Sequence, residues 1–86
     1  MAYNKPPKIT GFMPESLHKD DEQWVFAKLS PLHQDERMKV CSAYTNVFNK
    51  TFANEPLSHR KTGRARFAAN NRLRIYVDKK FAVFNK

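Results

Sequence analysis

The longest regular pattern of apolar residues lies in the middle of the chain, between Leu32 and Ala53, where neither glycine nor proline interrupts the sequence. Apolar residues recur there at intervals of three and four, which is the spacing of one face of an α-helix. They are Val40, Cys41, Tyr44, Val47, Phe48 and Phe52. Because Asn54 and Pro56 follow and are typical of a helix end, we expect one long helix across residues 32–53.

A shorter helix is predicted before it, beginning near Asp20. Asp20 followed three residues later by Gln23 matches a capping box, and the acidic residues between them suit the positive end of the helix dipole. The buried face of this helix is expected to consist of Trp24, Val25, Ala27 and Leu29. Ser30 and Pro31 predict its end and the start of the long helix, since serine is a favoured N-cap and proline a favoured first helical residue.

The C-terminal third carries two competing patterns. Thr62 is a candidate cap for a helix from Gly63 to about residue 71. Beyond it, Leu73, Ile75 and Val77 alternate with polar residues and Tyr76, as in a strand. In a continued helix Leu73 and Ile75 would lie about 200° apart, on nearly opposite faces.

The expected fold is therefore mainly α with a C-terminal β-hairpin, a small α+β domain whose second strand begins at Phe81. The alternative is an all-α domain of three helices, because Asp78, Lys79 and Lys80 contain no glycine for a tight hairpin turn. Residues 1–14, which include Pro6, Pro7 and Pro14, predict an extended N-terminal arm, and residues 15–86 a single small globular domain.

Charge is distributed very unevenly along this chain. Residues 1–38 hold five Lys or Arg against six Asp or Glu, net −1, whereas residues 39–86 hold eleven against two, net +9, which together make the total of +8. Six basic residues and no carboxylate lie between residues 60 and 74. They are Arg60, Lys61, Arg64, Arg66, Arg72 and Arg74. Such a positive field attracts a polyanion, an acidic protein surface or an anionic membrane.

Five of these six cations are arginines, whose guanidinium groups make bidentate contacts to phosphate or guanine. Asn70 and Asn71 carry amides that pair with adenine, and Phe67 and Tyr76 are candidates for stacking on unpaired bases. The sequence therefore predicts a small basic protein that binds DNA or RNA through this segment, mostly by phosphate contacts. The alternative is a modulator of the phage or mobile-element type that docks on a nuclease, helicase or polymerase of the host.

Catalysis, cofactors and metals are not expected. His18, His33 and His59 are isolated from one another, Cys41 lies on the apolar face of the long helix, and two glycines cannot build a phosphate-binding loop. The longest apolar runs are far below the roughly 20 residues that span a bilayer. We expect a cytoplasmic protein with no membrane segment; a homodimer that buries Tyr44 or Phe52 is one alternative, and complete coverage within the monomer is the other.

Overall fold

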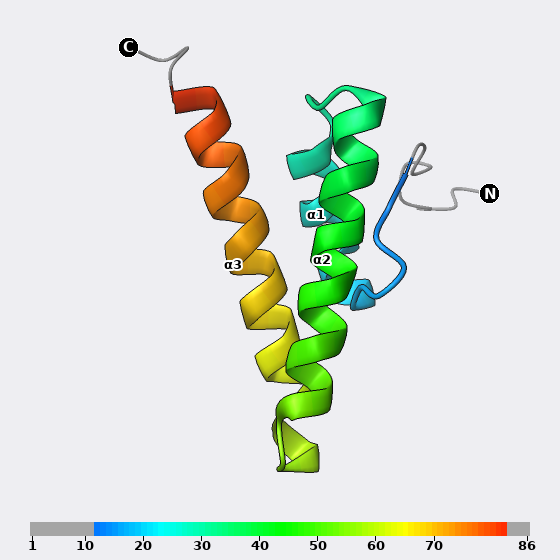
Figure 1. Cartoon of the computed structure of the whole chain (residues 1–86), viewed down its shortest axis with the longest axis vertical. Coiled ribbons are helices and arrows are strands. Elements are labelled where there is room, and N and C mark those ends of the chain that lie inside the picture. The colour runs from blue at the N-terminus through cyan, green and yellow to red at the C-terminus, as the bar shows by residue number, and fades with distance from the viewer. Residues whose placement is uncertain (1–11, 83–86) are drawn as a thin grey trace, which may run out of the picture.

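The structure, a computed structural model, describes residues 12–82, and all regular structure in that range is helical (Figure 1). A 3-10 turn, η1 (Lys19–Asp21), leads into the short helix α1 (Glu22–Leu29). The long helix α2 (Gln34–Asn54) follows, and a second 3-10 turn, η2 (Ser58–Arg60), leads into the equally long α3 (Lys61–Ala82).

Helix α2 confirms the predicted long helix in the middle of the chain. It ends at Asn54, before Pro56, and the N–H of Glu55 closes the last turn on the carbonyl of Thr51 at 3.1 Å. Its start differs from the prediction, because α2 begins at Gln34 rather than at Pro31. Ser30 instead ends α1: its backbone N–H and its hydroxyl both donate to the carbonyl of Phe26, at 3.0 and 2.9 Å.

The start of α1 also differs from the predicted capping box. His18 caps the η1 turn, since its Nδ1 accepts a hydrogen bond of 3.0 Å from the backbone N–H of Asp20. Asp21 occupies the N-cap position of α1 but makes no capping bond with its side chain. That carboxylate is turned toward α3 instead, with consequences for the candidate site.

The predicted C-terminal β-hairpin is wrong, and the all-α alternative of three helices is right. Helix α3 runs without a break from Lys61 to Ala82, through the residues expected to form the first strand and the turn. The buried residues of α3 are spaced by four: Ala65, Ala69, Leu73 and Val77. Ile75, which made the pattern look like a strand, is 43% exposed and lies on the opposite side of the helix. Two apolar residues two positions apart therefore need not share a buried face.

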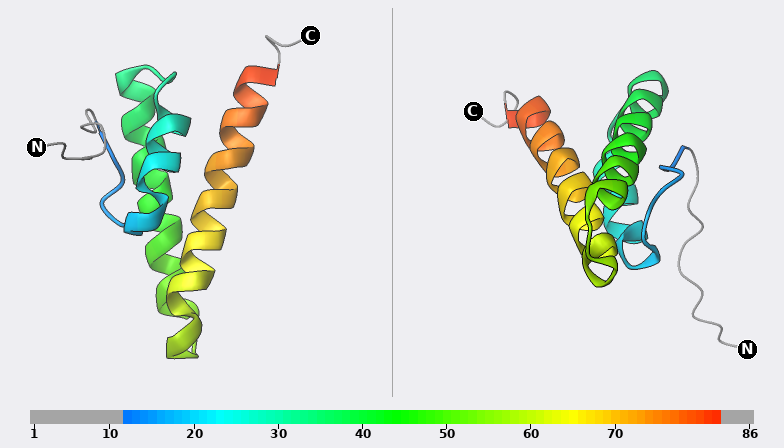
Figure 2. Two further views of the ribbon diagram at one scale, coloured as in Figure 1. Left: turned by 180° about the vertical axis from the view of Figure 1, so that it is seen from behind. Right: turned by 60° about the horizontal axis from the view of Figure 1, so that its bottom comes forward.

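Helices α2 and α3 form an antiparallel hairpin that is closed at the η2 turn and splayed at the other end (Figure 1). Helix α1 lies against the open part of this hairpin, between the two long helices when the molecule is seen from behind (Figure 2). The buried side chains of α3 become larger from the closed end of the hairpin to its splayed end. Ala65 and Ala69 lie near the turn, where small side chains let the helices approach, and Leu73 and Val77 lie toward the splayed end.

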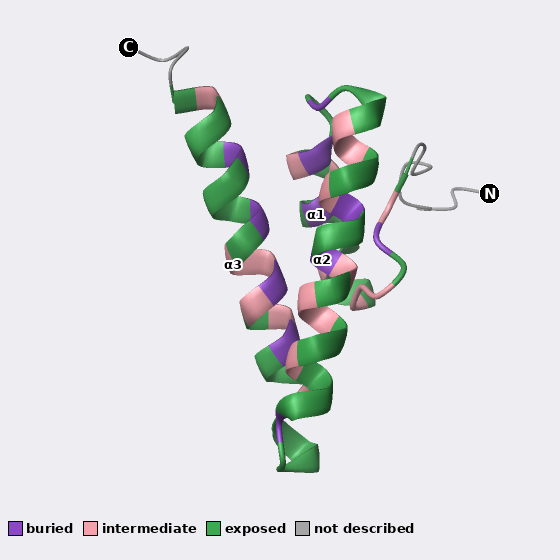
Figure 3. Ribbon diagram, in the orientation of Figure 1, coloured by how far each residue is buried: buried purple, intermediate pink, exposed green. Residues whose placement is uncertain are grey.

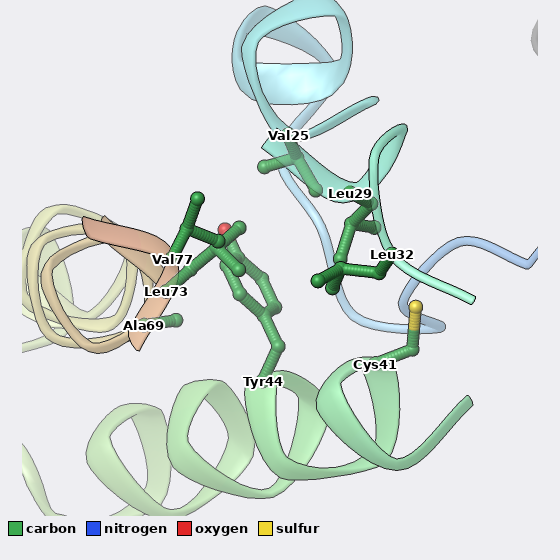
Figure 4. Packing of buried hydrophobic residues seen from close by; sticks show 8 residues of the cluster. All are labelled: Val25, Leu29, Leu32, Cys41, Tyr44, Ala69, Leu73 and Val77. Carbon is green, nitrogen blue, oxygen red and sulfur yellow. The ribbon is translucent and has the colours of Figure 1, made fainter. Parts of the chain in front are cut away.

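The core occupies the space between the three helices (Figure 4). Val25 and Leu29 of α1 are fully buried, and they point toward Tyr44 of α2 and Leu73 of α3. The buried residues of α3 form a stripe along the helix, whereas most of its other residues are exposed and a few in its middle are half-buried (Figure 3). Phe48 is half-buried at the edge of this core, with its ring stacked on that of Tyr44 at a centroid distance of 6.4 Å.

The described part of the predicted N-terminal arm packs along α2. Arg37 donates from Nε to the carbonyl of Phe12 at 2.7 Å, and the N–H of Glu15 donates to Oγ1 of Thr45 at 3.0 Å. Pro14 is buried there. Residues 12–14 therefore belong to the folded unit, while residues 1–11 of the predicted arm lie outside the described residues.

Candidate functional site

The basic segment predicted to bind nucleic acid is helical throughout, so its side chains point in several directions around η2 and the first half of α3. A strand would have placed alternate residues on one face. The helix instead divides the eight predicted residues into separate groups, according to which element each side chain meets.

Arg66 and Asn70 face α1 and hold the folded unit together. Arg66 donates from Nε and Nη2 to the two carboxylate oxygens of Asp21, both at 2.8 Å, and Asn70 donates from Nδ2 to Oδ2 of Asp21 at 2.9 Å. The hydroxyl of Tyr44 donates to Oδ1 of the same Asn70. This network, formed by Asp21, Tyr44, Arg66 and Asn70, ties the start of α1 to both long helices.

The electrostatics of the network follow from these contacts. The hydrogen bond from Arg66 holds the pKa of the Asp21 carboxyl below its ordinary value of 3.8, although partial burial works in the opposite direction. Burial, with a smaller contribution from the negative charge of Asp21, raises the pKa of Tyr44 to about 12. Because its donors are directed at Asp21, Arg66 is poorly placed to contact a ligand.

Lys61 and Arg64 meet the end of α2 at the turn between the long helices. The ammonium group of Lys61 donates to the carbonyls of Phe52 and Glu55, at 3.1 and 2.7 Å, where the last turn of a helix has no internal donors. Arg64 lies 3.2 Å from the buried carboxylate of Glu55, although half of the Arg64 side chain stays exposed. Lys61 is therefore structural, while Arg64 still presents donors to solvent.

The remaining cations differ in how far they are neutralised. Arg74 donates to Oδ1 of Asn71 at 2.6 Å and lies 3.9 Å from the carboxylate of Asp78, one turn further along α3. Arg60 and Arg72 are exposed, and neither side chain has a hydrogen-bond or ion-pair partner among residues 12–82. Arg60 is part of η2, whereas Arg72 lies in the groove between the long helices.

A groove runs between α2 and α3 along the side of the hairpin that α1 leaves uncovered, and we call it the interhelical groove. It has two parts, which share Val47 and Arg72 and are therefore continuous. The narrow part, nearer the η2 turn, has a volume of about 710 Å³ and is lined by Lys50 of α2 and by Arg64, Phe67 and Arg72 of α3. Within the described range, no carboxylate lines this narrow part.

The wide part of the groove, about 820 Å³, is less basic. Asp35 and Glu36 line it together with Lys39 and Arg72. Glu36 is already occupied, since it accepts a hydrogen bond from the Tyr76 hydroxyl and lies 3.1 Å from the ammonium group of Lys80. The hydrogen bond with Tyr76 lowers the pKa of Glu36 and raises the pKa of Tyr76. Positive charge in the groove is therefore concentrated in the narrow part.

The groove thus brings together Arg64, Asn71 and Arg72 of the predicted site, and adds Lys50 of α2, which was not among the residues predicted to bind nucleic acid. Lys50 lies on the same face of α2 as Asn46 and Val47, and this spacing was readable in the sequence. The sequence does not indicate, however, that this face of α2 meets the face of α3 that carries Arg72.

We also searched the described part of the chain for a reactive thiol, a metal site and a membrane-spanning helix. Cys41 is buried and directs its thiol toward the carbonyl of Phe12, and burial raises the pKa of this thiol. Within residues 12–82, no group of three or more His, Cys, Asp or Glu residues is arranged to hold a metal ion. None of the helices in this range has the length and apolar character needed to cross a bilayer.

Comparisons of this chain with models of known protein families, with curated proteins and with solved structures gave no match. The geometry of the groove and its charge are therefore the indications of function.

Proposed function

We propose that this protein binds nucleic acid, DNA or RNA, without catalysis and mainly through contacts to phosphates. The observation that supports the proposal is the narrow part of the interhelical groove, where Lys50, Arg64 and Arg72 surround one depression that no described carboxylate lines. Like charges brought together in a concave surface raise the local positive potential and attract a polyanion.

The absence of ion-pair partners for two of these cations, in the described range, agrees with a role in binding. Neither Lys50 nor Arg72 has an internal ion-pair partner in the described range, so both charges face solvent without compensation. A guanidinium that has no internal acceptor retains its full set of donors for a phosphate. Arg66, by contrast, has its donors directed at Asp21, and it is not part of the proposed contact surface.

A second candidate function is docking on a nucleic-acid-processing enzyme, in the manner of a phage-type modulator. A depression of about 390 Å³ on another face of α2 favours it, because Phe12 and Met38 line that depression and are 44% and 42% exposed. Apolar side chains exposed in one place are typical of protein contacts. The acidic residues at the start of α1 offer less negative charge to such a partner, since Asp21 is held by Arg66.

The test is a salt series of binding measurements by fluorescence anisotropy, with labelled single-stranded and duplex DNA and RNA. The double variant Lys50→Gln/Arg72→Gln is compared with the wild-type protein. If both residues contact phosphate, the slope of log affinity against log salt becomes shallower by about 1.4 on single strands or 1.8 on duplex, from roughly 0.7 or 0.9 per contact.

The matched control is Lys19→Gln, which removes a charge from the exposed surface of η1, outside the groove. It is expected to leave the slope nearly unchanged. Absence of binding by the wild-type protein at about 50 mM salt, where the electrostatic contribution is strong, contradicts the proposal and favours docking on a protein.

A further inference from the structure

Phe67 is the most exposed of the large apolar side chains in residues 12–82, with 72% of its surface accessible. The others in that range with substantial exposure lie between 37% and 46%. Its ring has no aromatic or cationic partner among the described residues, unlike Phe52, which lies beneath the ammonium group of Lys61. When a ligand covers a phenyl ring that was exposed to water, the burial of apolar surface stabilises the complex.

Phe67 lies in the basic groove rather than on an unrelated surface. It lines the narrow part together with Lys50, Arg64, Asn71 and Arg72. An aromatic ring among cations and amides is the combination found in proteins that bind single strands, where bases stack on the ring and phosphates meet the cations. From this juxtaposition we infer that the ligand of the groove is a single-stranded nucleic acid with one base stacked on Phe67, an inference that rests on the proposed function.

The shape of the site favours a single strand over a duplex. Bases in a duplex are stacked on their neighbours, so their faces are not accessible to Phe67, whereas an unpaired base has both faces free. A duplex is normally read by a protruding helix that enters the major groove. The outward face of α3 is poorly suited to that, because its Arg74 is held by Asn71 and Asp78. Two cations without ion-pair partners in the described range, Lys50 and Arg72, line a concave surface instead.

The contacts then divide according to chemistry. Lys50 on α2 and Arg72 on α3 lie on opposite walls of the groove and bind phosphates of the strand. Arg64 adds the donors that Glu55 does not use. Phe67 stacks on a base, which adds affinity with little dependence on sequence, because every base has a π-face. The groove thus accepts single strands of mixed sequence.

The test uses the full-length chain and three labelled ligands: oligothymidylate, an abasic oligonucleotide of the same length, and a duplex of mixed sequence. Phe67→Ala is expected to weaken binding to oligothymidylate by about 5- to 150-fold, which corresponds to about 1–3 kcal/mol at 1.4 kcal/mol per tenfold. Binding to the abasic oligonucleotide, which keeps the phosphates but has no bases, is expected to stay within about twofold of wild type. The salt slope is also expected to be unchanged, because it counts phosphate contacts.

Two further variants separate stacking from general apolar contact and from unfolding. Phe67→Tyr keeps an aromatic face and is expected to bind like the wild-type protein, whereas Phe67→Leu is expected to behave like Phe67→Ala. Phe12→Ala is the matched control, since it removes an exposed phenylalanine outside the interhelical groove and is expected to bind normally. Circular dichroism melts of all variants check that the fold is retained.

The outcomes distinguish this inference from the proposed function. The inference is supported if the wild-type protein binds oligothymidylate more tightly than duplex, and if this preference is lost in Phe67→Ala and retained in Phe67→Tyr. Duplex binding that equals or exceeds single-strand binding overturns it, as does a Phe67→Ala variant that is unchanged or equally weakened on all three ligands, while nucleic-acid binding itself still stands. Absence of binding to all three ligands, and to the single-stranded and duplex RNA of the salt series, overturns both.

Discussion

The guanidinium group of Arg66 on α3 holds the carboxylate of Asp21 at the start of α1 through two parallel hydrogen bonds of 2.8 Å. This pair joins residues 45 positions apart in the chain. It places a cation of the basic segment on the α1 side of the fold, away from the interhelical groove. The same contact makes the position of α1 dependent on the charge of one carboxylate.

We expect the pair to make stability depend on pH in the acid range. The pKa of Asp21 in the folded protein is below the ordinary value of 3.8, so its contribution to stability is fully present above that value and is lost as the pH falls through the folded-state pKa. The free energy of unfolding of Asp21→Asn is therefore expected to lie below that of wild type at neutral pH and to approach it as the pH falls from about 3.8 through the folded-state pKa of Asp21. Urea unfolding at several pH values measures this difference.

Asp20→Asn is the matched control for this experiment, because the carboxylate of Asp20 is 64% exposed and, among the described residues, acts on Arg66 of α3 through its charge and not through a hydrogen bond or ion pair. It is expected to show a smaller difference from wild type at neutral pH. If Asp21→Asn and wild type unfold alike at every pH, the pair with Arg66 does not stabilise the fold.

The helical structure of residues 73–77 is tested by two substitutions of similar size. Leu73→Ala removes a side chain that is 3% exposed and is expected to lower the free energy of unfolding by about 2–5 kcal/mol. Ile75→Ala removes one that is 43% exposed, and its effect is expected to stay within about 0.5 kcal/mol. Chemical denaturation measures both. Similar losses in the two variants would indicate a strand, in which the two residues share one face.

Gly63 offers a substitution that is expected to stabilise the protein. It lies in the first turn of α3, it is exposed, and a Cβ atom built at this position meets nothing within 4 Å. Gly63→Ala reduces the conformational freedom of the unfolded chain and is expected to raise the free energy of unfolding by about 0.5–1 kcal/mol. A thermal melt that shows a lower melting temperature would mean that α3 does not begin before this residue.

Arg66 and Arg72, both in the predicted basic segment, are expected to respond in opposite ways. Arg66→Gln breaks the contact with Asp21 and should lower the melting temperature, with little change in the salt slope of nucleic-acid binding. Arg72→Gln should leave the melting temperature unchanged and reduce that slope by about 0.7–0.9. Parallel melts and anisotropy titrations measure both quantities. Equal effects on binding would place the ligand on the α1 side of α3 as well.

Much of the helical structure was predictable because local signals were consistent. The long run without glycine or proline and the apolar spacing of α2 predicted the helix and its end next to Asn54, although the helix begins at Gln34 and not at Pro31. The segment after Arg72 was ambiguous, because Leu73 and Val77 fit a helix whereas Leu73, Ile75 and Val77 fit a strand. Local pattern alone does not say which residues of such a segment will be buried.

By itself, the sequence of this protein determined that a long central helix forms and that positive charge is concentrated after residue 38. The tertiary structure decided how that charge is presented. Packing of Ala65 and Ala69 against α2 selected one face of α3, which turned Arg66 toward Asp21 and placed Arg72 in the same groove as Lys50. Such pairings join residues from different helices, so they depend on how the helices pack, and spacing along the chain does not contain that information.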